Sequence, residues 1–214
     1  MEKQLIYLLA FIAGYILLLL FCECLGRWAN VRPEHTRKLA HIVSTLSTLL
    51  YPQLFSDHIY PLLLCLFFCI TLLITKRLKI IPSIDRVERK TEGSYMLALA
   101  VGTTYYLSIV CKEIAIYQLP ILVLAISDPL AGIVGQRVSS KRLFNGKTFV
   151  GSLSFFLSAF AISFVYLITE CHPPMWGISV LIALSTTIVE LFSPRGLDNL
   201  TIPLTIVAVL FMAL

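Results

Sequence analysis

The stretch Ala125–Ser152, AISDPLAGIVGQRVSSKRLFNGKTFVGS, contains the pattern from which the architecture of the chain follows. An apolar run is interrupted by Asp128-Pro129 and then resumes. A short basic segment follows, and a second apolar run begins at Phe149. Proline lacks a backbone donor and disfavours helical geometry in the residue before it. The pattern predicts two membrane helices joined by a cationic loop, the first of them broken at Asp128-Pro129, where Asp128 would cap the restarted helix.

The composition of the chain is that of a membrane protein. Its 214 residues are 58% hydrophobic and only 14% charged, more apolar surface than a soluble domain of this size can bury. We expect an all-α, polytopic integral membrane protein in which residues 1–214 form a single transmembrane catalytic domain. The formal net charge is +5. We attribute it first to basic residues that set the orientation of the protein in the membrane, and we expect no nucleic-acid partner.

About eight transmembrane helices are expected. The candidate spans are residues 5–25, 39–55, 60–75, 94–110, 116–135, 149–169, 175–192 and 200–214. Of the 17 Lys and Arg residues, 15 fall in the odd-numbered loops between these spans. The positive-inside rule therefore predicts that the odd loops lie in the cytoplasm and that both termini lie outside. The membrane that we expect is the cell inner membrane.

Two acidic residues within apolar runs are the first functional candidates. Asp128 is followed at helical spacing by small residues, and Glu190 lies near the end of its run. A carboxylate inside a membrane segment is costly and usually faces a cavity or a partner. The alternative for Asp128 is a purely structural cap above a helix-packing groove.

Cationic and hydroxyl residues surround these acids at the same side of the membrane. Lys147-Thr148 and Gly151-Ser152 open the span 149–169, where free backbone N–H groups would form a phosphate site. Lys90-Thr91 and Gly93-Ser94 repeat this arrangement before the span 94–110. Further polar candidates are Arg37, Lys38 and His41 in the span 39–55 and its approach, Arg89 and Lys141 in loops, and Arg195, Asp198 and Asn199 after Glu190. Two acids among cations fit a Mg²⁺–nucleotide site better than an ion pathway.

These motifs together resemble the CTP-dependent lipid-alcohol kinases, a family that includes dolichol kinase, phytol kinase and the CTP-dependent diacylglycerol kinase. The residues that carry the resemblance are Arg37-Lys38-Leu39-Ala40-His41, Asp128-Pro129-Leu130-Ala131 with Gly135, Lys147-Thr148 with Gly151-Ser152, and Glu190 with Ser193-Pro194-Arg195-Gly196-Leu197-Asp198-Asn199. One departure is Val150, at a position where the family often carries an acid.

The resemblance implies a membrane enzyme that phosphorylates a polyprenol, a phytol-like alcohol or a diacylglycerol from CTP, with Mg²⁺ or another divalent metal. By this resemblance Asp128 would be the metal and catalytic acid and Lys147 a phosphate ligand. Together with the residue patterns above, the predicted catalytic residues are Asp128, Lys147, Glu190 and His41, and the predicted metal residues are Asp128 and Asp198. The predicted nucleotide-binding residues are Arg37, Lys38, Arg89, Lys90, Thr91, Lys141, Thr148, Gly151, Ser152, Arg195 and Asn199. Two alternatives stay open, a phosphatidate cytidylyltransferase-like enzyme and a small non-enzymatic membrane carrier. A homo-oligomer also stays open.

Overall fold

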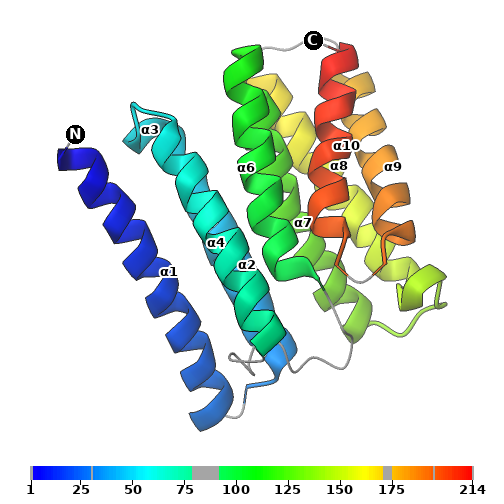
Figure 1. The fold of residues 1–214 in the computed structure, drawn as a ribbon. Coiled ribbons are helices and arrows are strands. Elements are labelled where there is room, and N and C mark those ends of the chain that lie inside the picture. Colours follow the sequence, from blue (N-terminus) through cyan, green and yellow to red (C-terminus); the bar gives the residue numbers. More distant parts are fainter. Residues whose placement is uncertain (1, 30, 79–91, 171–174, 195, 214) are drawn as a thin grey trace. The chain divides into compact units, whose positions relative to one another are not determined.

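The computed structural model describes residues 2–29, 31–78, 92–170, 175–194 and 196–213. Within these ranges the regular structure is helical apart from one isolated β-bridge, so the prediction of an all-α protein is confirmed. The elements, shown in Figure 1, are α1 (Glu2–Trp28), α2 (Pro33–Thr48), α3 (Tyr51–Leu54), α4 (Ile59–Leu78), α6 (Gly93–Cys111), α7 (Ala115–Arg137), η1 (Phe144–Gly146), α8 (Phe149–Thr169), α9 (Met175–Phe192) and α10 (Asp198–Ala213).

Six of these helices are long and apolar enough to cross a membrane, namely α1, α4, α6, α7, α8 and α9. The chain is therefore an integral membrane protein. The other two long helices, α2 and α10, have 16 residues each. Helix α10 is apolar but short, whereas α2 buries a polar stripe that consists of Thr36, Lys38, His41, Thr45 and Thr48. The described residues thus contain eight long helices besides the short α3 and η1, and six of these eight meet the criteria for a membrane span, where about eight spans were predicted.

The predicted span 39–55 has different bounds in the structure. Helix α2 begins earlier, at Pro33, because proline is well suited to the first position of a helix. It ends at Thr48, and the short α3 follows with Pro52 in its first turn. Proline cannot continue a preceding helical ladder without loss of a hydrogen bond. The segment therefore forms a polar helix and a short turn of helix.

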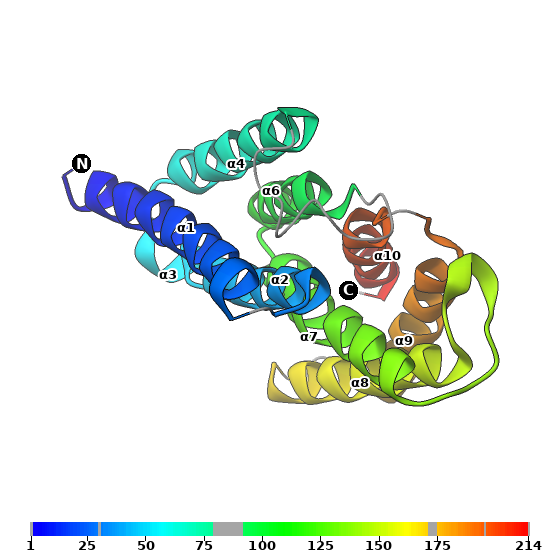
Figure 2. The same ribbon diagram turned by 90° about the horizontal axis from the view of Figure 1, so that it is seen from below.

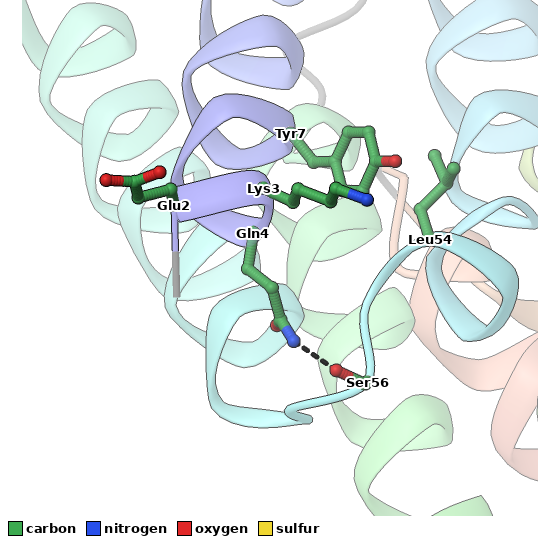
Figure 3. A pocket seen from close by; sticks show the side chains of 6 residues that line it. All are labelled: Glu2, Lys3, Gln4, Tyr7, Leu54 and Ser56. Atoms are coloured by element: carbon green, nitrogen blue, oxygen red, sulfur yellow. Dashed lines mark hydrogen bonds between the residues drawn. The ribbon is translucent and has the colours of Figure 1, made fainter.

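The chain divides into two compact units, Met1–Gly102 and Thr103–Leu214, and α6 contributes its first half to the former and its second half to the latter. In the first unit α1 packs against α2 and α4. The aromatic rings of Phe11 and Tyr51 meet edge to face at 5.0 Å between centroids. Figure 3 shows how the first turn of α1 is tied to the α3–α4 turn, where the Gln4 side chain donates to Ser56 Oγ.

The second unit is a helical bundle in which α7 packs on α8, α8 on α9, α9 on α10, and α10 on α7. Figure 2 shows these four helices from below. Fully buried apolar side chains from each helix fill the centre, with Leu119, Phe155, Ile182 and Ile206 among them. The rings of Tyr105 and Tyr117 join the second half of α6 to α7 at 5.1 Å. This bundle holds most of the predicted site residues.

Helix α7 differs from the prediction at Asp128-Pro129. It is bent, but it is not broken, because helical geometry is continuous from Ala115 to Arg137 with both Pro120 and Pro129 inside it. Asp128 therefore lies within the helix, and the prediction that it caps a restarted helix is wrong. Packing of α7 against both α8 and α10 compensates for the hydrogen bond that Pro129 removes.

Candidate functional site

An ion-pair cluster centred on Lys147 lies in the second unit, where the α7–α8 loop contacts the end of α9 and the start of α10. The Lys147 ammonium is 2.5 Å from Glu190 Oε1 and 2.9 Å from Asp198 Oδ2. Glu190 comes from the last turn of α9 and Asp198 from the first residue of α10, so one lysine joins two helices. The side chains of Lys147, Glu190 and Asp198 are 20%, 4% and 13% exposed. Three residues that the sequence proposed separately are thus in direct contact.

Asp128 completes the cluster electrostatically. Its half-buried carboxylate interacts with both Lys147 and Glu190. Burial of the Lys147 ammonium would by itself lower its pKa, but the carboxylates of Asp198, Glu190 and Asp128 outweigh burial and raise the pKa above its usual value. The ammonium therefore stays charged at neutral pH. Three carboxylates and one ammonium leave an excess of negative charge, which is the condition under which a cation is attracted.

The loop between α7 and α8 is folded by its own backbone. Arg142 and Thr148 form an antiparallel bridge, and Leu143 N–H donates to Lys147 O at 2.7 Å. At the tip, Lys147 N–H donates to Phe144 O at 3.0 Å, across Asn145 and Gly146. Both of these residues have positive φ, 53° and 71°, as the central residues of a type I′ turn do. Lys147 leaves this turn directly toward α9 and α10.

The N-terminus of α8 is capped by residues of the chain itself. Thr148 is the N-cap, and its hydroxyl accepts from Gly151 N–H at 3.2 Å. Phe149 N–H donates to Lys141 O, and Val150 N–H donates to Ser140 Oγ. The prediction that these N–H groups are free is therefore wrong, because those of Phe149, Val150 and Gly151 all donate to acceptors within the chain.

Gly135 and Gly151 bring α7 and α8 into close contact next to the cap. A Cβ atom on Gly135 would lie 2.5 Å from Thr148 Oγ1, and one on Gly151 would lie 3.0 Å from Ala131 O. Both glycines are thus required by packing. The sequence alone did not decide whether the small residues after Asp128 contact another helix or a ligand. At Gly135 the contact is with helix α8 and its N-cap.

Glu190 Oε2, in the cluster itself, is buried and makes no hydrogen bond, and the same is true of Ser127 Oγ and Ser152 Oγ in the second unit. Ser127 precedes Asp128 in α7, and Ser152 lies in the first turn of α8. Buried polar atoms without a partner are costly and few in native proteins. Glu190 therefore has one oxygen bound to Lys147 and one available for a ligand.

The remaining described candidates divide between the two units. In the first unit, Lys38 and His41 are buried in α2, and Glu34 pairs with Arg37 at 3.4 Å and with Lys38 at 3.6 Å. In the second unit, Lys141 is exposed and Asn199 is buried at the start of α10. Arg89, Lys90, Thr91 and Arg195 lie outside the described residues. A depression in the first unit, lined by Glu2, Lys3, Gln4, Tyr7, Leu54 and Ser56, contains none of the predicted residues (Figure 3).

Among the described residues, no three His, Cys, Asp or Glu side chains are grouped closely enough to hold a metal ion by themselves. In the Lys147 cluster, two carboxylates, those of Glu190 and Asp198, lie against one ammonium. Magnesium is usually held by one or two carboxylates together with substrate phosphates and waters. The cluster offers hard oxygen donors of that type, including the unpartnered Glu190 Oε2.

Sequence reasoning missed Asn145. Its side-chain amide donates to Leu191 O at 3.3 Å and to Phe192 O at 3.1 Å, the last two carbonyls of α9. The available signal was the Asn145-Gly146 dipeptide, which is typical of turns with positive φ. The dipeptide indicates the turn, but it does not indicate which helix the asparagine side chain contacts.

Comparison with known proteins shows two phytol kinase relatives over most of the chain. A phytol kinase of Synechocystis sp. is 30% identical over 197 residues, which cover 86% of this chain and 82% of that protein. A chloroplastic protein of Oryza sativa subsp. japonica, named "Probable phytol kinase 1", is 29% identical over 196 residues, 79% of this chain and 61% of that protein.

A third relative, an uncharacterized protein of Rickettsia prowazekii, is 40% identical over 86 residues, 39% of this chain and 42% of its own length. No protein-family model matches the chain. No solved structure matches it either.

Proposed function

Because the chain belongs to the phytol kinase family, we propose that it transfers a phosphoryl group from CTP to the hydroxyl of a membrane-dissolved isoprenoid alcohol of the phytol type. The observation that carries this proposal is the Lys147 cluster, in which an ammonium lies against Glu190 and Asp198 with Asp128 in electrostatic range. Phosphoryl transfer requires positioned cations and carboxylates more than covalent chemistry from the protein.

Lys147 serves in this proposal as the ligand of the triphosphate. Its ammonium pairs with two carboxylates, which hold it in place and favour its charged form. Arg37, Lys38 and Lys141, with Arg89, Lys90, Thr91 and Arg195, are further nucleotide candidates. Thr148, Gly151, Ser152 and Asn199 complete this group. The structure supports Thr148 and Gly151 most directly as parts of the fold that orients Lys147.

The carboxylates are the proposed metal residues. One or two carboxylates among Asp128, Asp198 and Glu190, together with phosphate oxygens of the nucleotide, would hold Mg²⁺ or another divalent metal. Their fit is supported by the excess of carboxylates over ammonium groups and by the unpartnered Glu190 Oε2. When bound, the metal would neutralise charge on the phosphate oxygens. The three carboxylates alone repel a nucleotide, so we expect CTP to bind poorly in the absence of a divalent metal.

The alcohol must lose its proton during transfer. Asp128 is the proposed acceptor in the second unit, because its carboxylate is partly exposed and interacts with Lys147. His41, buried in α2 of the first unit, is the second proposed acceptor. The lipid alcohol would enter from the bilayer, and CTP from the cytoplasm, the side on which the positive-inside rule predicts the α7–α8 loop to lie.

The test uses purified protein with CTP, Mg²⁺ and one of three acceptors: phytol, a long polyprenol or diacylglycerol. We expect CDP to form at a rate that depends on the acceptor and is highest with phytol. Asp128→Asn and Lys147→Met should each lower the rate of CDP formation about a thousandfold, whereas Ser139→Ala, in an exposed part of the same loop, should leave the rate unchanged. Absence of CDP with every acceptor would overturn the kinase proposal, and release of pyrophosphate in its place would favour a cytidylyltransferase.

A further inference from the structure

The last turn of α9 is held by two residues of the α7–α8 loop that lie only two positions apart. Asn145 donates its side-chain amide to Leu191 O and Phe192 O. Lys147 binds the carboxylate of Glu190 on the same turn. The rings of Phe144 and Phe192 also meet, with centroids 5.0 Å apart. The end of α9 is thus fixed to the loop by hydrogen bonds, by an ion pair and by ring packing.

The two amide bonds of Asn145 act where a helix has unsatisfied carbonyls. The last four carbonyls of a helix have no partner within it and are normally capped by glycine motifs, side chains or water. In α9 two of these carbonyls accept from Asn145, which is 46 and 47 residues earlier in the chain. The cap therefore fixes a long-range contact, and it does so beside the residue that carries the site's ammonium.

Asparagine is suited to this position for a second reason. Its φ of 53° lies in the left-handed region, where asparagine is several-fold enriched among residues other than glycine. The turn that this conformation closes, with Lys147 N–H on Phe144 O, determines where the Lys147 side chain starts. One residue thus provides both the turn and its anchor.

We propose that Asn145 is a positioning residue for Lys147: its amide anchors the loop to the carbonyl end of α9 and so keeps the Lys147 ammonium between Glu190 and Asp198, where it meets the phosphates of the nucleotide. Only the last clause rests on the proposed function. Asn145 itself does not touch the reacting groups. Its loss would release the loop tip, and Lys147 would spend more time in solvent, away from the two carboxylates.

The test measures the position of Lys147 without reference to activity. Detergent-solubilised protein is treated briefly with acetic anhydride, and mass spectrometry gives the acetylation of Lys147 relative to Lys141, an exposed lysine of the same loop. In the wild type Lys147 is protected by its ion pairs. Asn145→Gly keeps the positive φ but removes the amide, and should raise the ratio about fivefold, the effect of one net hydrogen bond. Ser139→Ala should leave it unchanged.

Asn145→Asp provides a second variant of nearly the same shape. Its carboxylate cannot donate to Leu191 O and Phe192 O, and it should raise the ratio at least as much as glycine does. If neither variant raises the ratio while thermal unfolding shows a folded protein, the amide does not position Lys147 and the inference is overturned. A purely structural cap would lower the unfolding temperature and leave the ratio at its wild-type value.

The second measurement is the kcat/KM for CTP with phytol as acceptor. Asn145→Gly should lower it about fivefold. In a Lys147→Ala background the same substitution should leave the residual rate unchanged, because an effect transmitted through Lys147 cannot add to its removal. An equal loss in both backgrounds would contradict the inference. If the acetylation ratio rises but the wild type consumes no CTP, the positioning role stands and the proposed function fails.

Discussion

Replacing Lys147 by methionine separates the structural part of the site from its chemistry. The substitution keeps an unbranched chain of similar length but leaves the Glu190 and Asp198 carboxylates without their common cation. Their side chains are 4% and 13% exposed. Removal of one partner from a buried ion pair costs about 3–5 kcal/mol. Since Lys147 is 20% exposed, we expect a loss near the lower limit, about 3 kcal/mol.

The assay for this prediction is thermal unfolding in detergent. A loss of about 3 kcal/mol corresponds to a decrease in Tm of roughly 6–12 °C for a chain of this length. The control is Glu190→Gln in the Lys147→Met background, which removes the uncompensated buried charge and should recover most of the loss in Tm. Turnover should not recover in the double variant. A Tm unchanged by Lys147→Met, or no recovery on adding Glu190→Gln, would refute the ion-pair reasoning.

Three further predictions concern the same unit. Gly135→Ala should destabilise the protein by about 1–3 kcal/mol, because its Cβ would lie 2.5 Å from Thr148 Oγ1; Gly177→Ala, with nothing within 4 Å, is the matched control in thermal unfolding. Asp128→Asn should lower kcat about a thousandfold, because a metal-binding charge contributes several kcal/mol to transition-state stabilisation, and it should leave Tm near the wild-type value. Retained turnover would show that Asp128 has only a structural role. The pKa of Lys147 is raised in the folded protein, so the ion pairs of Lys147 stabilise the fold fully below the unfolded pKa of about 10.4, and this stabilisation is lost only as pH rises through the folded pKa. The difference in unfolding free energy between wild type and Lys147→Met should therefore be equal at pH 7.5 and pH 10. A smaller difference already at pH 9 would contradict this.

The sequence was sufficient for the helical architecture because its signals are local. Long apolar runs, and prolines and basic residues between them, indicate helices and their ends without reference to the rest of the fold. The start of α8 at Phe149 and the end of α9 at Phe192 lie where the sequence predicted them. The continuity of α7 through Pro129 was not predictable in this way, because neighbouring helices decide whether a proline bends or ends a helix.

The candidate site was predictable as a set of residues but not as a set of contacts. Asp128 and Glu190 were identified as acids within apolar runs, and Lys147 and Asp198 as charges in the loops beside them; the structure brings the four together. That Lys147 pairs with both acids depends on how α8, α9 and α10 pack, which no local pattern contains. The same holds for Asn145, whose partners lie 46 and 47 residues away.

The most direct test of the central claim follows the phosphorus atoms of CTP into the lipid. Purified protein is incubated with Mg²⁺, phytol and CTP labelled with ³²P at either the γ or the α position, and the lipid fraction is extracted. A kinase places the alcohol oxygen in line with the γ-phosphorus. We predict that γ-label enters a phytyl phosphate, that α-label does not, and that Lys147→Met and Asp128→Asn lower the rate of γ-label incorporation about a thousandfold. Label arriving from the α position, or none from the γ position, would contradict the account.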